Sequence, residues 1–167
     1  RNMCHWFCIN TNKNFMTHRE VVQQDALSIA VQHNRCGLGI SMGVGKTRVA
    51  IQHLQRNYDP FIKALVVIPK LSIKDSWIAE LEKMNLSNLE SHLTFTTYLS
   101  INKHNPMEYQ LVYLDECHSL LDNHRTFLSA YSGKILGLTG TPPVRKGTEK
   151  YTMVSEFCPI KFTFTVD

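Results

Sequence analysis

Residues 42–47, Met-Gly-Val-Gly-Lys-Thr, constrain the fold of this chain more than any other stretch. An apolar run, residues 36–40, precedes them, and a helical pattern, residues 48–54, follows. A strand, a glycine turn that ends in Lys-Thr and a helix together are typical of a phosphate-binding loop. Gly43 and Gly45 permit a tight turn whose backbone N–H groups face phosphate oxygens, and the positive end of the helix faces the same anion.

The chemistry expected of this loop is nucleotide binding. Lys46 is expected to reach the β- and γ-phosphates of ATP, and the hydroxyl of Thr47 to bind Mg²⁺. The residues expected to bind the nucleotide here are Met42, Gly43, Val44, Gly45, Lys46, Thr47 and Arg48. The general pattern G-x-x-x-x-G-K-[ST] requires glycine where this chain has Ile40. A chance Gly-Lys-Thr in a surface loop is the alternative, and the rest of the chain decides between the two.

A second motif is an acidic pair at the end of an apolar run, in residues 110–118, Q-L-V-Y-L-D-E-C-H. Such a run predicts a buried parallel strand whose acids lie at its C-terminal end, where open α/β sheets bind ligands. Asp115 is expected to hold Mg²⁺, directly or through water, and Glu116 to orient and deprotonate the attacking water. The alternative is a solvated acidic pair that begins the next helix. The upstream phosphate loop favours the catalytic interpretation.

A third apolar run, residues 134–138, ends in Thr-Gly-Thr-Pro, which by itself is simply a turn. Alternation of such runs with helical patterns predicts an α/β fold, a mostly parallel sheet with helices on both faces. Thr17 and Glu20 fit a capping box that opens a helix ending near His33. We expect strands near 36–41, 63–68, 93–96, 110–114 and 134–138. Between them we expect helices at 47–57, 72–84, 97–103 and 119–130. The tail, residues 144–167, is expected to contain a short helix and then a strand at 161–166.

With these motifs in this order, the chain resembles the first RecA-like domain of superfamily 2 helicases and translocases. It is most similar to the Swi/Snf-like and phage-type members. The matching pieces, within residues 18–143, are the glutamine motif at Gln23 with Ala26, motif I at 41–47, motif Ia at 64–70 with Trp77 after it, motif Ib at 94–98, the D-E-C-H box at 115–118 and motif III at 139–142. In that family the position of Ile40 is often not glycine, so the departure from the general pattern is expected.

The resemblance assigns roles beyond phosphate binding. Gln23 would read adenine, although the adjacent Gln24 leaves the register open. His118 would couple the nucleotide site to the threonines of motif III, Thr139 and Thr141.

The resemblance also implies contacts with the nucleic-acid backbone. Lys70 and Thr97 follow predicted strands where a phosphate could meet them, although for both residues a solvated side chain is an equal alternative. Trp77 is expected in the core, because apolar residues accompany it on one face of its helix. Four histidines are expected at the surface or at helix ends, namely His33, His53, His92 and His104.

The family pattern includes a second RecA-like domain with motifs IV to VI and an arginine finger. The 24 residues after Pro143 are too few for it, and the chain begins with Arg rather than Met, which favours a piece of a longer protein over a divergent single-domain relative. We expect an N-terminal arm or remnant at 1–16, a RecA-like domain at 17–143, and an extension or linker to a second domain at 144–167.

Composition sets broader limits. A length of 167 residues with 43% hydrophobic residues suits one globular domain, and no apolar run is long enough for a membrane span. Five cysteines, at positions 4, 8, 36, 117 and 158, are scattered and odd in number, so we expect reduced thiols in the cytoplasm or nucleus, or a viral or phage protein acting in a host cell. Cys4, His5 and Cys8 lack a second ligand pair at zinc spacing. A net charge of +4 permits nucleic-acid binding without establishing it.

The sequence therefore predicts an ATP-hydrolysing motor domain of a DNA helicase or translocase, with ATP and Mg²⁺ as cofactors. It would follow phosphates rather than read bases. One alternative is a viral DNA-packaging ATPase, which also has a D-E pair after a strand; Gln23 and residues 139–142 favour the helicase. The other is a non-catalytic nucleotide-binding or scaffold module, against which the intact Lys46, Asp115 and Glu116 argue.

Overall fold

Six strands form one sheet in the order β3-β2-β4-β5-β1-β6, and each of the five pairings between neighbours is parallel. The computed structural model describes residues 16–166. The strands are β1 (Arg35–Ile40), β2 (Ala64–Ile68), β3 (Leu93–Thr97), β4 (Leu111–Asp115), β5 (Lys134–Thr139) and β6 (Ile160–Phe164). The predicted α/β class is confirmed, and the sheet is parallel in all the strands described rather than mostly parallel.

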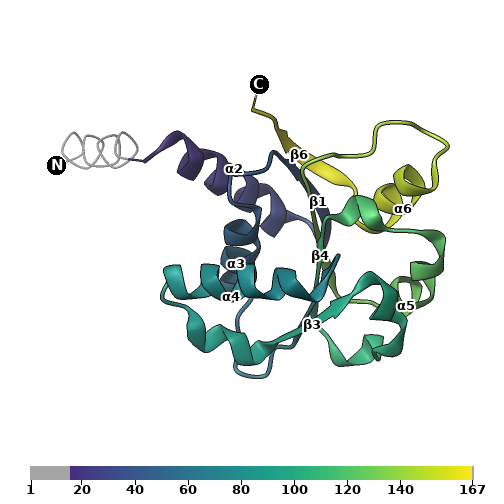
Figure 1. Cartoon of the computed structure of the whole chain (residues 1–167), viewed down its shortest axis with the longest axis horizontal. Helices are drawn as coiled ribbons and strands as arrows, with labels where there is room; N and C mark the ends of the chain where they lie inside the picture. Colours follow the sequence, from purple (N-terminus) through teal and green to yellow (C-terminus); the bar gives the residue numbers. More distant parts are fainter. Residues whose placement is uncertain (1–15, 167) are drawn as a thin grey trace.

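Helices cover both faces of this sheet (Figure 1). On one face lie α2 (His18–Gln32), α3 (Lys46–Arg56) and α4 (Lys74–Lys83); on the other lie α5 (Arg125–Ala130) and α6 (Glu149–Phe157). Short 3-10 turns join the elements at η1 (Leu71–Ile73), η2 (Ser87–His92), η3 (Tyr98–Lys103), η4 (Pro106–Glu108), η5 (Cys117–Ser119) and η6 (Asp122–His124). Helix α2 begins where the sequence predicts, because the Thr17 hydroxyl accepts a hydrogen bond from the Glu20 N–H at 3.1 Å.

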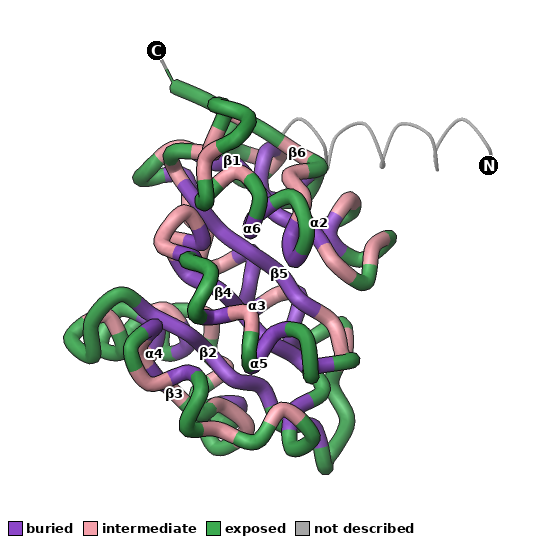
Figure 2. Tube along the Cα trace, turned by 90° about the vertical axis from the view of Figure 1, so that its right-hand side faces the viewer, coloured by how far each residue is buried: buried purple, intermediate pink, exposed green. Residues whose placement is uncertain are grey.

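The strands at the centre of the sheet are buried on both sides, as their continuous apolar runs predict. Every residue of β2 and of β4 is buried, and Figure 2 shows these strands as an unbroken buried track. Alternate residues of β4 pack into the two hydrophobic cores, one on each face of the sheet. Leu111 and Tyr113 pack with the α2–α4 layer, whereas Val112 and Leu114 pack with the α5–α6 layer.

Two predicted helices are wrong in type or extent. In place of the helix predicted at 97–103, Thr97 ends β3 and residues 98–103 form the 3-10 turn η3, whose two buried side chains, Tyr98 and Ile101, have the three-residue spacing of that helix. The predicted helix at 119–130 is interrupted, because Leu120 and Leu121 have extended backbones, and α-helix is present only in α5. The predicted helix at 72–84 is nearly right, although its first turn is the 3-10 turn η1.

The expected surface position of His53 is also wrong. Its side chain is 2% exposed and its Nδ1 lies 2.8 Å from the hydroxyl of Tyr113. The cause is helical spacing, since Ala50, His53 and Leu54 lie on the face of α3 that packs against the sheet. Burial, and secondarily the positive charge of Lys134, lowers the pKa of His53 to about 4.

Within residues 16–166, the cysteines Cys36, Cys117 and Cys158 are buried free thiols. The other two cysteines, His5 and nearly all of the predicted N-terminal arm lie outside the described residues. In the tail, α6 and β6 join the same layers, with β6 beside β1. No helix of the described part combines the length and apolar character needed to cross a membrane.

The strand order determines where the motifs meet. Strands β4, β5 and β1 are neighbours, and all point the same way. The segments after them, residues 116–119, 140–142 and 41–45, therefore leave the sheet at one edge. In parallel sheets this C-terminal edge is where ligands bind.

Candidate nucleotide-binding and catalytic site

The glycine loop has the geometry that its sequence predicts. Gly43 and Gly45 have φ angles of 87° and 95°, which residues with a side chain rarely adopt. Gly45 precedes the 11-residue helix α3, and no side chain caps that helix. The N–H groups of its first turn and its positive end are thus available to an anion. The expected phosphate-contacting residues 42–47 lie together at this helix terminus.

Ile40 stands where the general loop pattern has glycine, and its position explains why glycine is not needed. It is the last residue of β1 and is 0% exposed. Its side chain belongs to the core between the sheet and the α2–α4 layer. The turn itself begins one residue later, so the loop keeps its shape with a large side chain at position 40.

Gln23 contacts the loop directly. Its side-chain Nε2 donates to the Val44 carbonyl at 2.7 Å, whereas Gln24 is exposed. The structure therefore resolves which of the two glutamines faces the loop. A Cβ atom added to Gly45 would lie 2.4 Å from Gln23 Nε2, so the Gln23 amide would have to move away from its place against the loop. Whether Gln23 reads adenine stays a prediction.

Arg48 lies where three adjacent cavities meet. Its Nε donates to Glu80 Oε1 of α4 at 2.8 Å. One cavity of about 420 Å³ lies between the glycine loop and α4, and two others of about 460 and 370 Å³ extend past Gln23 toward α2. Together they offer a continuous set of hollows from the phosphate loop to the glutamine motif.

Lys46 contacts the acidic motif across the sheet edge. Its Nζ lies 3.3 Å from Oε1 of Glu116, and the two side chains are 13% and 33% exposed. Glu116 has a φ of 53° and a ψ of 56°, a left-handed conformation that is unusual for a residue with a side chain. Such backbone strain is concentrated at functional sites, because only a surrounding structure that fixes the residue maintains it.

Asp115 is buried at the end of β4, where it is 7% exposed. Burial raises the pKa of its carboxyl above the ordinary value, and the hydrogen bond from Trp77 opposes that rise. The negative charge of Glu116 adds to the rise, and the positive charge of Lys46 opposes it. The indole Nε1 of Trp77 donates to Asp115 Oδ2 at 3.2 Å.

The donor types at this edge suit Mg²⁺. The Thr47 hydroxyl and the Asp115 carboxylate are oxygen ligands, which this ion prefers. Residues 16–166 contain no group of three or more His, Cys, Asp or Glu side chains that could enclose a metal ion. Mg²⁺ commonly keeps several waters and uses one or two carboxylates together with substrate phosphates, so one hydroxyl and one carboxylate fit it as a donor set.

The D-E-C-H box and the threonine turn form one hydrogen-bonded cluster. Nδ1 of His118 lies 2.8 Å from the Thr139 hydroxyl, 3.3 Å from the Thr141 hydroxyl and 3.5 Å from Glu116 Oε2. The Thr139 hydroxyl also accepts from the Thr141 N–H at 3.0 Å. The three residues predicted to couple the site are therefore in direct contact with one another and with the acidic motif. Their coupling role stays a prediction.

The two predicted nucleic-acid contacts lie farther along the same edge. Lys70 is exposed just after β2, and Thr97 is the last residue of β3, in register with Ile68 of β2. Neither of them lines the three cavities beside Arg48. Lys70 and Thr97 therefore lie outside these hollows.

Some residues of the site gave no sequence signal for it. Glu80 and Lys83 line the hollows from α4, and Trp77 and Tyr98 both bond Asp115. Trp77 is 1% exposed, which confirms its expected place in the core, but nothing in the sequence indicates its contact with a carboxylate. A tryptophan and a tyrosine predict burial from composition alone, and their hydrogen-bond partners depend on how distant elements pack.

Comparison with known protein families shows the family of this chain. Residues 13–144 match the family described as Type III restriction enzyme, res subunit (ResIII). The chain belongs to this family. Among curated proteins, QP509L of African swine fever virus (isolate Pig/Kenya/KEN-50/1950), a provisionally assigned ATP-dependent RNA helicase, is 29% identical over 77% of this chain. The match covers 29% of that protein, so the ResIII domain spans less than a third of the relative's length.

Solved structures of other proteins have the same fold. UvsW of T4 superposes with a TM-score of 0.68 at 15% identity, over 86% of this chain and 33% of UvsW. The SWI2/SNF2 ATPase core of Sulfolobus solfataricus, solved with double-stranded DNA, gives 0.63 at 18% identity, over 85% and 35% of the two chains. These structures confirm the predicted RecA-like fold, and together with the ResIII match they confirm the predicted resemblance to superfamily 2 helicases.

Proposed function

We propose that this ResIII domain binds ATP with Mg²⁺ and hydrolyses it to drive movement of a larger protein along a nucleic-acid backbone. The observation that carries the proposal is the meeting of three separate motifs at one sheet edge. Lys46 of the phosphate loop contacts Glu116, and Glu116 contacts His118, which bonds Thr139 of the threonine turn. A fold used only as a scaffold has no need of this constellation.

The residues of this chain suggest a division of work. The loop N–H groups and Lys46 would neutralise the β- and γ-phosphates, and Gln23 would contact the base. Thr47 and Asp115 would hold Mg²⁺, which when bound neutralises charge on the phosphate oxygens. Glu116 would orient the attacking water and accept its proton.

Coupling between the nucleotide site and the nucleic-acid contacts would pass through His118. Loss of the γ-phosphate alters what Glu116 faces, and Glu116 Oε2 lies 3.5 Å from the His118 ring. The ring in turn bonds Thr139 and Thr141. A change at Glu116 would therefore reach the threonine turn by direct contact.

DNA is the nucleic acid that we propose, with Lys70 and Thr97 at its phosphates. The neighbouring SWI2/SNF2 core was solved with double-stranded DNA, whereas the viral relative is assigned as an RNA helicase. The two nucleic acids are distinguished by measuring affinity for DNA and RNA oligonucleotides of the same sequence.

The parent protein is expected to supply a second RecA-like domain. The relatives matched are more than three times as long as the matched part, which leaves room for one. An arginine from that domain could contribute about 10³–10⁵ to the rate. The proposal therefore includes slow hydrolysis by these 167 residues alone and faster hydrolysis by the parent protein.

Of the two alternatives, the packaging ATPase is disfavoured by the ResIII match, since that family is one of restriction-enzyme subunits. The non-catalytic module requires an experiment. Its distinguishing feature is nucleotide binding without turnover in the full-length parent protein.

Nucleotide binding is tested by thermal unfolding of this chain with Mg²⁺ and ADP. At 100 times its Kd the nucleotide adds about 2.7 kcal/mol, a rise in Tm of roughly 5–10 °C for a domain of this size. Lys46→Ala is expected to abolish the rise. Lys70→Ala, an exposed lysine at the same edge, is the matched control and is expected to keep it. An unchanged Tm in the folded wild type would overturn the proposal.

A further inference from the structure

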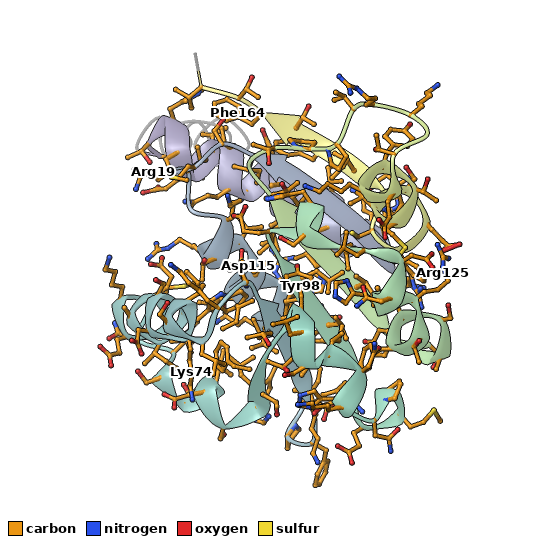
Figure 3. The ribbon with its side chains drawn as sticks, turned by 45° about the vertical axis from the view of Figure 1, so that its right-hand side comes forward. Arg19, Lys74, Tyr98, Asp115, Arg125 and Phe164 are labelled. Carbon is orange, nitrogen blue, oxygen red and sulfur yellow. The ribbon has the colours of Figure 1, made fainter. Side chains whose placement is uncertain are left out.

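Asp115 is held at two points by aromatic side chains from two different elements. Trp77 of α4 donates its indole N–H to the carboxylate Oδ2 at 3.2 Å. Tyr98 of η3 donates its hydroxyl to the main-chain carbonyl of the same residue at 2.5 Å. Both donors are buried, with Trp77 1% and Tyr98 7% exposed. Figure 3 places Asp115 and Tyr98 together in the interior, away from the exposed Arg19 and Lys74.

The bond from Trp77 fixes how the carboxylate is turned. The indole ring is itself fixed, because it packs against Phe95 and Tyr113 with ring centroids 6.2 and 6.0 Å apart. Its N–H donates only one bond, and that bond occupies Oδ2. Within residues 16–166 no other side chain donates a hydrogen bond to this carboxylate, which also accepts one from the backbone of Glu116, so Trp77 is the side chain that fixes its orientation.

The bond from Tyr98 fixes the backbone beyond β4. The Asp115 carbonyl belongs to the same planar peptide unit as the N–H of Glu116. A donor on that carbonyl therefore orients the peptide plane from which the strained, left-handed Glu116 departs. The Tyr98 ring is supported in turn by His124, whose ring centroid lies 5.4 Å away.

We propose that Trp77 and Tyr98 are positioning residues for the metal ligand, Trp77 by orienting the Asp115 carboxylate and Tyr98 by fixing its main chain. The inference rests on the proposed function, because it assigns Asp115 to Mg²⁺. It also ties the metal site to the segments that carry the predicted nucleic-acid contacts. Tyr98 directly follows Thr97, and Trp77 lies on the helix that follows Lys70. Groups that orient a metal ligand from behind typically change metal affinity by about 10–100-fold when lost.

The test measures how much Mg²⁺ strengthens ADP binding to the 167-residue chain. ADP affinity is determined by calorimetry in EDTA and at increasing Mg²⁺ concentrations for the wild type, Trp77→Phe and Tyr98→Phe. We expect the affinity in EDTA to be kept, because the phosphate loop is untouched. The gain on adding Mg²⁺ is expected to fall about 10-fold or more in Trp77→Phe, and to fall measurably in Tyr98→Phe.

Tyr113→Phe is the matched control. It deletes the same single oxygen from a tyrosine that is also buried, but this hydroxyl lies 2.8 Å from His53 rather than at Asp115. It is expected to keep the full gain on adding Mg²⁺. A gain in both test variants equal to that of the wild type, or an equal loss in Tyr113→Phe, would overturn the inference.

Misfolding of a variant and failure of the proposed function itself can each be told apart from the outcomes above. If Trp77→Phe proves unfolded by circular dichroism, Tyr98→Phe decides alone, since it removes one atom and leaves the ring. If the wild type fails to bind ADP under any condition, the proposed function fails first. A wild type whose ADP affinity is indifferent to Mg²⁺ would leave the nucleotide site standing and overturn the assignment of Asp115 and its two supports.

Discussion

Nζ of Lys46 and Oε1 of Glu116 lie 3.3 Å apart, so the lysine proposed to bind phosphate and the glutamate proposed to activate water are paired with each other. The pair spans two motifs that are far apart in the sequence and meet only because β1 and β4 flank β5. A γ-phosphate arriving between them would compete with Glu116 for the lysine. Nucleotide binding in this domain is therefore expected to separate the pair.

Replacing Glu116 by glutamine should divide binding from chemistry. The amide keeps the shape of the side chain but removes both the base and the negative partner of Lys46. We expect ADP affinity to be kept or increased, because the lysine is released, and ATP turnover in the parent protein to fall by about 10²–10⁴-fold. Calorimetry and single-turnover hydrolysis measure the two quantities. Wild-type turnover in this variant would remove Glu116 from the role of base.

Gly45→Ala is expected to damage the nucleotide site through a collision and not only through backbone strain. Alanine at a φ of 95° costs about 1–2 kcal/mol, and its Cβ would also displace the Gln23 amide. Gly147→Ala is the control, because Gly147 has a φ of 89° and nothing within 4 Å of the added atom. Urea unfolding should show that both variants lose stability through backbone strain, and that Gly45→Ala loses more. ADP binding should be weakened only in Gly45→Ala. Equal effects on ADP binding would argue against the contact with Gln23.

Nucleic-acid binding is expected to depend on salt and to be insensitive to base sequence, because the proposed contacts are to phosphates. Lys70→Ala should weaken affinity equally for all sequences and reduce the slope of log K against log salt by about 1. Lys63 is an exposed lysine at the opposite end of the same strand, so Lys63→Ala should change neither. Fluorescence anisotropy over a salt series measures both. A loss confined to one oligonucleotide sequence would contradict a backbone contact.

The buried His53 predicts a loss of stability in acid. Its pKa is about 4 in the folded chain against an ordinary 6.5, so the unfolded state binds more protons between these pH values. Its stabilising contribution is full above pH 6.5 and is lost as the pH falls toward 4. The difference is at most about 3 kcal/mol.

His53→Asn isolates that contribution from the carboxylates that titrate in the same range. The asparagine Oδ1 can replace Nδ1 toward Tyr113 and carries no proton. The free energy of unfolding in urea, measured at pH 7 and pH 4.5, should fall less in this variant than in the wild type. His33→Asn, at a position that is not buried, should behave as the wild type. A wild type and a His53→Asn variant with the same pH dependence would exclude His53 as the cause.

Local sequence patterns were sufficient to predict most of the helices and strands. Apolar runs predicted β1, β2, β4 and β5 because a strand covered on both faces needs continuous hydrophobic sequence. The capping residue Thr17 marked the start of α2 for a similarly local reason, a hydrogen bond three residues away. The helices predicted at 97–103 and 119–130 are wrong in type or extent, because 3-10 turns and extended breaks depend on which side chains the neighbouring elements bury.

The site shows the same division. Gly43, Gly45, Lys46 and Thr47 could be assigned from the sequence, since a loop and the helix that follows it make the phosphate cradle from consecutive residues. The acidic pair Asp115 and Glu116 could likewise be predicted from the sequence, because it directly follows an apolar run that predicts a buried strand.

What the sequence by itself determined is thus the α/β class, the glycine loop and the chemical identity of the groups at each strand end. Only the tertiary structure decided which of these groups touch: Lys46 with Glu116, His118 with Thr139, and Trp77 with Asp115. The physical reason is that such contacts depend on strand order and on the packing of helices across the sheet. Both are set by the burial of the whole core, and no short stretch of the chain encodes them.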